Sequence, residues 1–144
     1  MKGDVIKRIV LDASVAVAWC FEDESAGLAE GVLDLLLAGT EVLTPAIWPF
    51  EVANALLMAE RRKRIKVAQA SAFLQRIAGL PISIDPIQPA TAFNQILSVA
   101  RQNGLTEYDA AYVELALREA LPLATLDEKL RRVAMRVGVT LVAT

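Results

Sequence analysis

The sequence predicts an α/β fold in which a parallel sheet is covered by helices on both faces. Short segments of three to five apolar residues alternate with longer helical segments along the chain, and this alternation is typical of such a fold. Hydrophobic residues make up 55% of the chain, which is enough for one sizeable core. The length of 144 residues fits a single domain over residues 1–144.

Each element of the first half has its own signal. β-branched residues in KRIVL favour a strand. Helical periodicity that stops at Gly39 favours an amphipathic helix before that glycine. The segment PAIWPFEVANALLMA is apolar almost all the way round, as in a buried helix. The expected elements are a strand at Lys7–Leu11, helices at Ser14–Phe21 and Ser25–Leu37, a strand at Glu41–Leu43, and a helix from Pro45 to about Arg64.

Glycine and proline set most boundaries in the second half. Gly79 and Gly104 end two helices, and Pro122 ends a third, because proline cannot continue a helix. The expected elements are a helix at Val67–Ala78, a strand at Ile82–Ile84, a helix at Ala90–Gln102, a helix from Thr106 to before Pro122, a strand at Leu123–Thr125, a helix at Asp127–Val137 and a strand at Thr140–Val142.

Two features of the composition exclude several kinds of active site. The chain has no histidine, which removes Ser-His-Asp triads, imidazole acid–base pairs and the usual zinc sites. Its single cysteine, Cys20, forms neither an internal disulfide nor a zinc knuckle. A buried thiol in a reducing compartment is the expected state of Cys20.

The N-terminal residues loosely resemble a signal peptide, because MKGDVIKR precedes the apolar run IVLDASVAVAWCF. Asp12 interrupts that run, and no segment reaches the length of a membrane span. We therefore expect a soluble cytoplasmic protein that does not associate with a membrane.

Two acidic residues directly follow predicted strands, where sites form in parallel sheets. Asp12 ends the strand in RIVLDAS, and Asp127 follows the strand LAT. Each has a structural alternative. Asp12 could be the N-cap of the next helix. Asp127 could be an acid favoured by the helix dipole, beside a capping box formed by Thr125 and Glu128.

Glu51 is a carboxylate in an otherwise apolar helix. Helical spacing places it on one face with Ile47, Asn54, Ala55 and Met58. The alternative to a functional role is an ion pair with a distant Arg or Lys, although burying such a pair among apolar residues is costly.

Asp109 lies in LTEYDAAYVELALREA on the same helical face as the apolar residues Tyr112, Val113 and Ala116. We therefore expect it to point inward. Glu107 and Glu114 are expected to be solvated, the latter as an i,i+4 partner of Arg118. The structural alternative for Asp109 is the third position of a capping box that Thr106 begins.

Considered together, the four acids indicate a cation site. Nearby carboxylates repel one another unless a cation offsets their charge. With no histidine available, a site of oxygen ligands favours Mg²⁺ or Mn²⁺. Such a site suits metal-assisted hydrolysis of a phosphodiester bond.

Four stretches in this order resemble the PIN-domain ribonucleases, and among them the VapC-type toxins of toxin–antitoxin pairs. They are IVLDASVAVAW, PFEVANAL, LTEYDAAYVELA and LATLDEKLRRVA, and they span nearly the whole chain. The resemblance implies a single nuclease domain with a three-layer α/β/α sandwich and a mostly parallel central sheet. It also implies a homodimer that an antitoxin peptide inhibits by lying across the active site.

The resemblance further implies roles for individual residues. Asp12, Glu51, Asp109 and Asp127 would form the catalytic, metal-binding site, with Asp12 and Asp109 touching the metal directly and the other two acting through waters or a second ion. Supporting polar residues would be Ser14, Asn54 and Thr125.

Two clusters of basic residues could contact the RNA backbone. One comprises Arg61, Arg62, Lys63, Arg64 and Lys66, and the other Lys129, Arg131, Arg132 and Arg136. The second is the better candidate because it adjoins Asp127. An ordinary solvated helix surface is the alternative for both clusters.

Other classes of protein fit less well. A phosphatase of the haloacid dehalogenase type needs a second Asp where Ser14 stands, and the acids and late lysine of a receiver domain are missing. A PIN-like module that only binds RNA or protein is the remaining alternative. Metal-dependent cleavage that disappears in Asp12→Asn would separate an enzyme from such a module.

Overall fold

In the computed structural model, which describes residues 6–21 and 27–143, four parallel strands form one central sheet. The strands are β1 (Arg8–Leu11), β2 (Glu41–Pro45), β3 (Ile82–Asp85) and β4 (Leu123–Ala124), in the order β3-β2-β1-β4. The predicted parallel α/β fold is therefore confirmed. β1 lies inside the sheet, and its Ile9, Val10 and Leu11 are fully buried, which explains why its sequence is a continuous apolar run.

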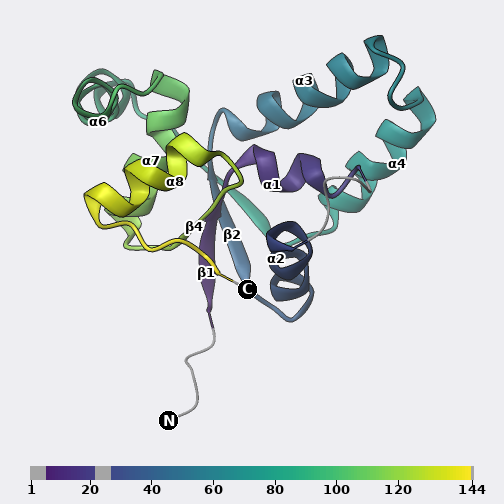
Figure 1. The fold of residues 1–144 in the computed structure, drawn as a ribbon, viewed down its shortest axis with the longest axis horizontal. Coiled ribbons are helices and arrows are strands. Elements are labelled where there is room, and N and C mark those ends of the chain that lie inside the picture. Colours follow the sequence, from purple (N-terminus) through teal and green to yellow (C-terminus); the bar gives the residue numbers. More distant parts are fainter. Residues whose placement is uncertain (1–5, 22–26, 144) are drawn as a thin grey trace.

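Helices cover the sheet on both sides (Figure 1). On one side are α1 (Ala13–Ala18), α2 (Leu28–Leu37), α3 (Trp48–Arg61) and α4 (Val67–Ala78). The other side carries α5 (Pro89–Thr91), the π-helical segment η1 (Ala92–Ile96), α6 (Leu97–Asn103), α7 (Glu107–Glu119) and α8 (Glu128–Val137). None of the helices in the described ranges is long and apolar enough to cross a membrane.

The order of the strands fixes where a site can form. The chain passes from β1 to β2 to β3 in one direction and then returns to β4 on the other side of β1. Because crossovers are right-handed, the outgoing and returning helices cover opposite faces. The connections that leave β1 and β4 therefore diverge at their carboxyl ends, and this is the position at which doubly wound sheets form a binding crevice.

Several predicted elements differ from the observed ones. The helix expected at Ala90–Gln102 is divided by the π-helical segment η1. The strand expected at Thr140–Val142 is reduced to one bridge between Leu141 and Leu123. The helix expected to reach Arg64 ends at Arg61, because Lys63 adopts a positive φ of 60°. The expected start of the helix at Ser25 lies outside the described residues.

The prediction that the third helix is buried on every side is wrong. Trp48, Val52, Leu56 and Ala59 of α3 are buried, but Phe50 is 73% exposed. Figure 1 shows that α3 and α4 extend together beyond the rest of the fold, which explains why one side of α3 stays open.

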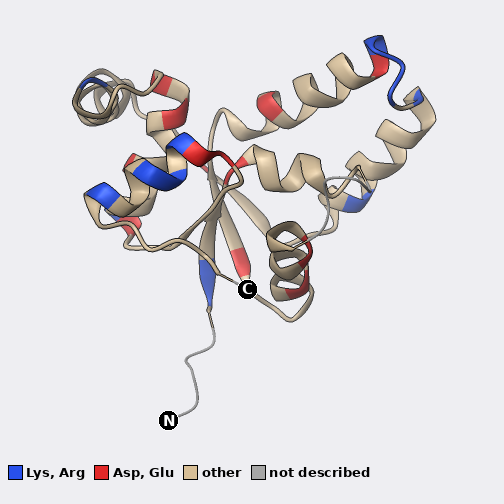
Figure 2. Ribbon diagram, in the orientation of Figure 1, with Lys and Arg blue, Asp and Glu red and all other residues tan. Residues whose placement is uncertain are grey.

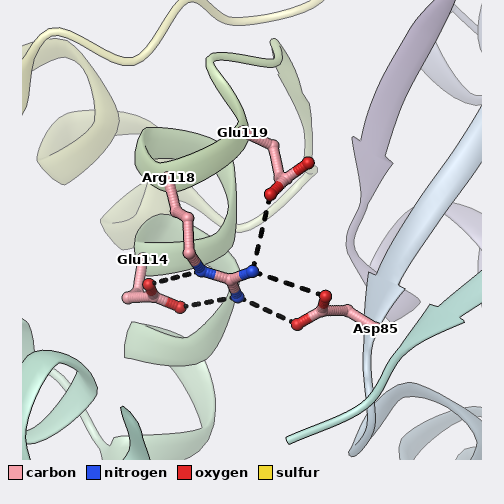
Figure 3. A network of polar contacts seen from close by, with 4 residues as sticks. All are labelled: Asp85, Glu114, Arg118 and Glu119. Carbon is pink, nitrogen blue, oxygen red and sulfur yellow. Dashed lines mark hydrogen bonds and ion pairs between the residues drawn. The ribbon is translucent and has the colours of Figure 1, made fainter.

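A cluster of ion pairs attaches α7 to the edge strand β3 (Figure 3). The Arg118 guanidinium donates to Glu114 on its own helix at 2.9 Å and to Asp85 at the end of β3 at 2.9 Å. Glu114 is only 6% exposed, so the expectation that it is solvated is wrong. Its carboxylate tolerates burial because Arg118 supplies both charge and hydrogen bonds.

Candidate acidic site

The acidic residues singled out in the sequence come from four segments that meet at the carboxyl ends of β1 and β4. Figure 2 shows acidic segments at the β1–α1 junction, at the start of α8, and on α3 and α7. Asp12 directly follows β1, and Asp127 is the third residue after β4. Glu51 lies in the first turn of α3 and Asp109 in the first turn of α7.

Asp12 is a buried carboxylate whose described partners are hydroxyl groups. It is 6% exposed, and its Oδ2 accepts hydrogen bonds from Ser14 Oγ at 2.6 Å and Thr125 Oγ1 at 2.8 Å. Asp12 occupies the N-cap position of α1, but its side chain makes no capping bond. The capping alternative therefore does not account for this side chain. Nor does any ion pair between described residues neutralise it.

The same two hydroxyls connect the β1–α1 turn to the β4–α8 loop. Ser14 Oγ accepts the backbone N–H of Leu126 at 3.0 Å, and Thr125 Oγ1 accepts the N–H of Asp127 at 3.0 Å. Arg131 reinforces this loop by donating to the Thr125 carbonyl at 2.8 Å. These bonds fix the backbone on which Asp12 and Asp127 are placed.

Glu51 faces the hydroxyl of Tyr112. Tyr112 Oη donates to Glu51 Oε1 at 2.5 Å across 61 residues of sequence. The sequence alternative, a buried ion pair with Arg or Lys, is not what the described residues form. Sequence reasoning counted Tyr112 only as an apolar neighbour of Asp109. The helical spacing of three residues between them was the signal that it also faces the site.

Asp109 and Asp127 combine a structural position with a place beside the other acids. The backbone N–H of Asp109 donates to Thr106 Oγ1 at 3.1 Å, so Thr106 is the N-cap of α7. This bond is one half of the capping box considered for Thr106 and Asp109. Asp127 is itself the N-cap of α8, since its Oδ1 accepts the N–H of Leu130 at 3.0 Å. The expected capping box of Thr125 and Glu128 is therefore replaced by a cap that Asp127 provides.

Burial and mutual repulsion make three of the four carboxyl groups harder to ionise. Desolvation raises the pKa of Asp12 above its ordinary value, and the charges of Asp109 and Asp127 raise it further. Desolvation also raises the pKa of Glu51, with added repulsion from Asp12 and Asp109. The pKa of Asp109 is raised by desolvation and by Asp127, against an opposing effect of Lys129. The four groups therefore influence one another as a single cluster of negative charge.

The donor chemistry of this cluster fits a hydrated divalent cation. Within the described ranges, no three acidic or cysteine side chains lie close enough together to hold an ion by direct contact alone. Mg²⁺ is normally bound through one or two carboxylates and keeps several waters. This cluster of oxygen ligands, with three raised pKa values, is compatible with an ion held by one or two carboxylates and several waters. It is not compatible with an ion surrounded by protein ligands alone.

Of the three predicted supporting residues, two lie in the site, and one makes no hydrogen bond to the four acids in the described structure. Ser14 and Thr125 lie in the site and bind Asp12. Asn54 is exposed on α3 and makes no hydrogen bond to the acids in the described part of the chain. Glu107, expected to be solvated, is half-buried instead, and its Oε1 is buried with no hydrogen-bond partner among the described residues.

The two basic clusters lie in different places. The cluster that begins at Arg61 and Arg62 lies where α3 ends and α4 begins, at the opposite end of α3 from Glu51 (Figure 2). The cluster on α8 adjoins the site, but two of its members have structural contacts. Lys129 Nζ donates to the Gly104 carbonyl at 2.6 Å, and Arg131 holds the Thr125 carbonyl. Arg132 is exposed, and contact with RNA stays a prediction.

A protein-family model and a protein of known name both match most of the chain. The family model described as PIN domain matches residues 9–135. The chain is 30% identical over 123 residues to a protein named Ribonuclease VapC3 from Pyrobaculum aerophilum, covering 85% of this chain and 92% of that protein.

Solved structures share the fold. The crystal structure of PAE2754 from Pyrobaculum aerophilum superposes with a TM-score of 0.69 at 24% identity and covers 91% of this chain and 87% of that one. VapBC2 from Rickettsia felis, solved bound to a DNA fragment from its promoter, gives a TM-score of 0.65 at 16% identity and covers 94% and 98%.

Proposed function

Because the chain belongs to the PIN-domain family, we propose that it is a metal-dependent endoribonuclease that hydrolyses RNA phosphodiester bonds at its acidic site. One observation carries the proposal. Asp12 is a buried carboxylate held by two hydroxyls, at the divergence of β1 and β4, within reach of the charges of Asp109 and Asp127. A fold does not maintain such a cluster for stability, because its members repel one another and are costly to bury.

Mg²⁺ or Mn²⁺ is the cofactor of this proposal. Asp12 and Asp109 would hold the ion directly, and Glu51 and Asp127 would hold it through waters or bind a second ion. When bound, the ion would supply positive charge to the phosphate and lower the pKa of a water molecule.

The residues of the chain would orient the carboxylates of the site and provide a group that accepts a proton. Ser14 and Thr125 both bind Oδ2 of Asp12, which leaves Oδ1 for a ligand. Tyr112 binds Oε1 of Glu51, which leaves Oε2. Glu51 would then be placed to accept a proton from a water molecule, since a general base acts through an oxygen within hydrogen-bond reach of that water.

We further propose that the protein is the toxin of a toxin–antitoxin pair. Support comes from the relative named Ribonuclease VapC3 and from the structural similarity to VapBC2. The partner would be a VapB-like antitoxin, and the protein would act as a homodimer in the cytoplasm. The alternative is a PIN-like module that binds RNA or protein with little or no cleavage.

Cleavage assays on RNA separate these two functions. Cleavage should require Mg²⁺ or Mn²⁺, stop in EDTA, and disappear in Asp12→Asn, while Glu128→Gln, an exposed acid on α8, should cleave normally. Full activity in EDTA would overturn the metal mechanism. RNA binding without cleavage by the wild-type protein under any metal condition would favour the binding module.

A further inference from the structure

Tyr112 is a completely buried tyrosine, 0% exposed, whose hydroxyl reaches the acidic site. It lies on α7, one turn after Asp109, and binds Glu51 on α3. These two helices cover opposite sides of the sheet (Figure 1). The hydrogen bond therefore joins the two outer layers of the sandwich at the carboxyl ends of the strands.

The same hydroxyl lies near the turn that carries Asp12. Burial and the charge of Asp12 both raise the pKa of Tyr112, and the backbone of Ala13, the residue that follows Asp12, opposes that rise. A tyrosine hydroxyl donates one hydrogen bond and accepts others, so donation to Glu51 leaves its oxygen able to accept. The Tyr112 hydroxyl is thus bound to one acid of the site and close to the turn that carries another.

A purely structural role would not require this hydroxyl. The ring fills core space that a phenylalanine ring fills equally well, and a buried hydroxyl is costly unless it is hydrogen-bonded. The side chain it binds is an acid of the site.

We propose that Tyr112 is a positioning residue of the acidic site, whose hydroxyl holds Glu51 Oε1 and leaves Oε2 for the cation that the site would bind. This assignment rests on the proposed metal-dependent function. It extends the site to a residue that touches neither the RNA nor the ion. Its contribution is to preorganise Glu51, since residues that orient a metal ligand affect both affinity and activity.

Tyr112→Phe tests the assignment because it removes one oxygen and keeps the ring. We expect Mn²⁺ affinity, measured by isothermal titration calorimetry without RNA, to fall by roughly 10-fold, the lower end of the range for such supporting residues. We expect kcat for RNA cleavage to fall by a similar factor, while KM for RNA stays within about twofold. Tyr108→Phe is the matched control, because Tyr108 lies on the same helix and is 60% exposed. It should change neither quantity.

A double-mutant cycle distinguishes positioning from a general effect on the fold. In a Glu51→Ala background, Tyr112→Phe should cause no further loss of Mn²⁺ affinity, because the hydroxyl has lost the group it orients. Additive losses would overturn the assignment. If Tyr112→Phe folds poorly, the free energies of unfolding of the two single mutants and the double mutant are measured in EDTA instead. Additive losses of stability in that cycle would also overturn the assignment.

The assignment and the proposed function fail in different ways. Wild-type protein that neither binds Mn²⁺ nor cleaves RNA would overturn both. Wild-type protein that does both, together with an unchanged Tyr112→Phe, would overturn only the role of Tyr112.

Discussion

At the scale of single residues, the site contains carboxylates that the protein keeps in place with hydroxyl groups instead of with cations. Ser14 and Thr125 bind Asp12, and Tyr112 binds Glu51. A hydroxyl satisfies a lone pair of the carboxylate without neutralising its charge. The negative charge therefore stays available to a cation, in contrast to Glu114, which Arg118 neutralises.

Replacing Glu51 by Gln should stabilise the metal-free protein. Gln removes one of the repelling charges and keeps an oxygen that accepts the Tyr112 hydrogen bond. In EDTA, the free energy of unfolding should rise, because desolvation and repulsion from Asp12 and Asp109 disfavour the charged form of Glu51 in the folded protein. Thermal melts of both proteins in EDTA and in Mn²⁺ measure this effect. Mn²⁺ should stabilise the wild type more than the mutant.

The control is Glu60→Gln, which changes an acid on the last turn of α3 and should have little effect in either condition. A Glu51→Gln protein that is less stable in EDTA and insensitive to Mn²⁺ would show that Glu51 is a structural residue.

The raised pKa values also predict an unusual pH dependence in EDTA. The pKa values of Asp12, Glu51 and Asp109 are higher in the folded protein than their unfolded values near 4. Between the two values the folded state binds more protons, so stability falls as the pH rises through the folded pKa values. When the pH is lowered from 7.5 to 5 in EDTA, the melting temperature of the wild type should therefore rise more than that of Asp12→Asn. Equal shifts for the two proteins would contradict this prediction.

At the scale of elements, the helix starts perform two tasks at once. The N–H groups at the first turn of a helix favour nearby negative charge, and α7 and α8 both begin at the site with an acid in or before that turn. Asp127 caps α8 through Oδ1, which leaves Oδ2 for function. The structural and functional interpretations of Asp127 are therefore compatible with each other.

Two substitutions of Asp127 separate these tasks. Asp127→Asn keeps a good N-cap and should leave the melting temperature nearly unchanged. Asp127→Ala removes the capping oxygen and should cost about 1 kcal/mol of stability. Both should reduce RNA cleavage if the charge takes part in the reaction. Normal cleavage by Asp127→Asn, beside a destabilised Asp127→Ala, would mean that Asp127 is only a cap.

At the scale of the whole molecule, the two helical layers meet above the strand ends and bring together acids that are far apart in sequence. A cluster of this kind attracts any cation that reaches it, including one carried by another protein. The proposed antitoxin is therefore expected to place an Arg or Lys among the four acids, where its charge replaces that of the metal.

A synthetic peptide from the antitoxin should compete with Mn²⁺. Its addition should reduce both Mn²⁺ binding and RNA cleavage, and a version with the inserted Arg or Lys changed to Gln should lose most of this effect. An antitoxin that inhibits neither metal binding nor cleavage would contradict the prediction. Salt titration provides a further measurement, because charge-based inhibition should weaken as ionic strength rises.

The sequence by itself determined most of the elements and the segments on which the four acids lie. Val67–Ala78 was predicted with its observed bounds, and Asp12 and Asp127 were placed after the correct strands. Hydrophobic periodicity, glycine and proline boundaries, and caps are local properties, so a single chain segment carries them. The positions of the four acids and the absence of histidine led to the prediction of a cation site, which stays a prediction.

Only the tertiary structure decided which side chains meet. The partner of Glu51 is Tyr112, 61 residues away on the opposite helical layer, and no local pattern specifies such a contact. In the same way, Arg131 binds the Thr125 carbonyl of the site loop, and Arg118 allows Glu114 to be buried. These pairings depend on how the two layers pack across the sheet, because packing brings a side chain within hydrogen-bond distance of residues that its own segment does not contain.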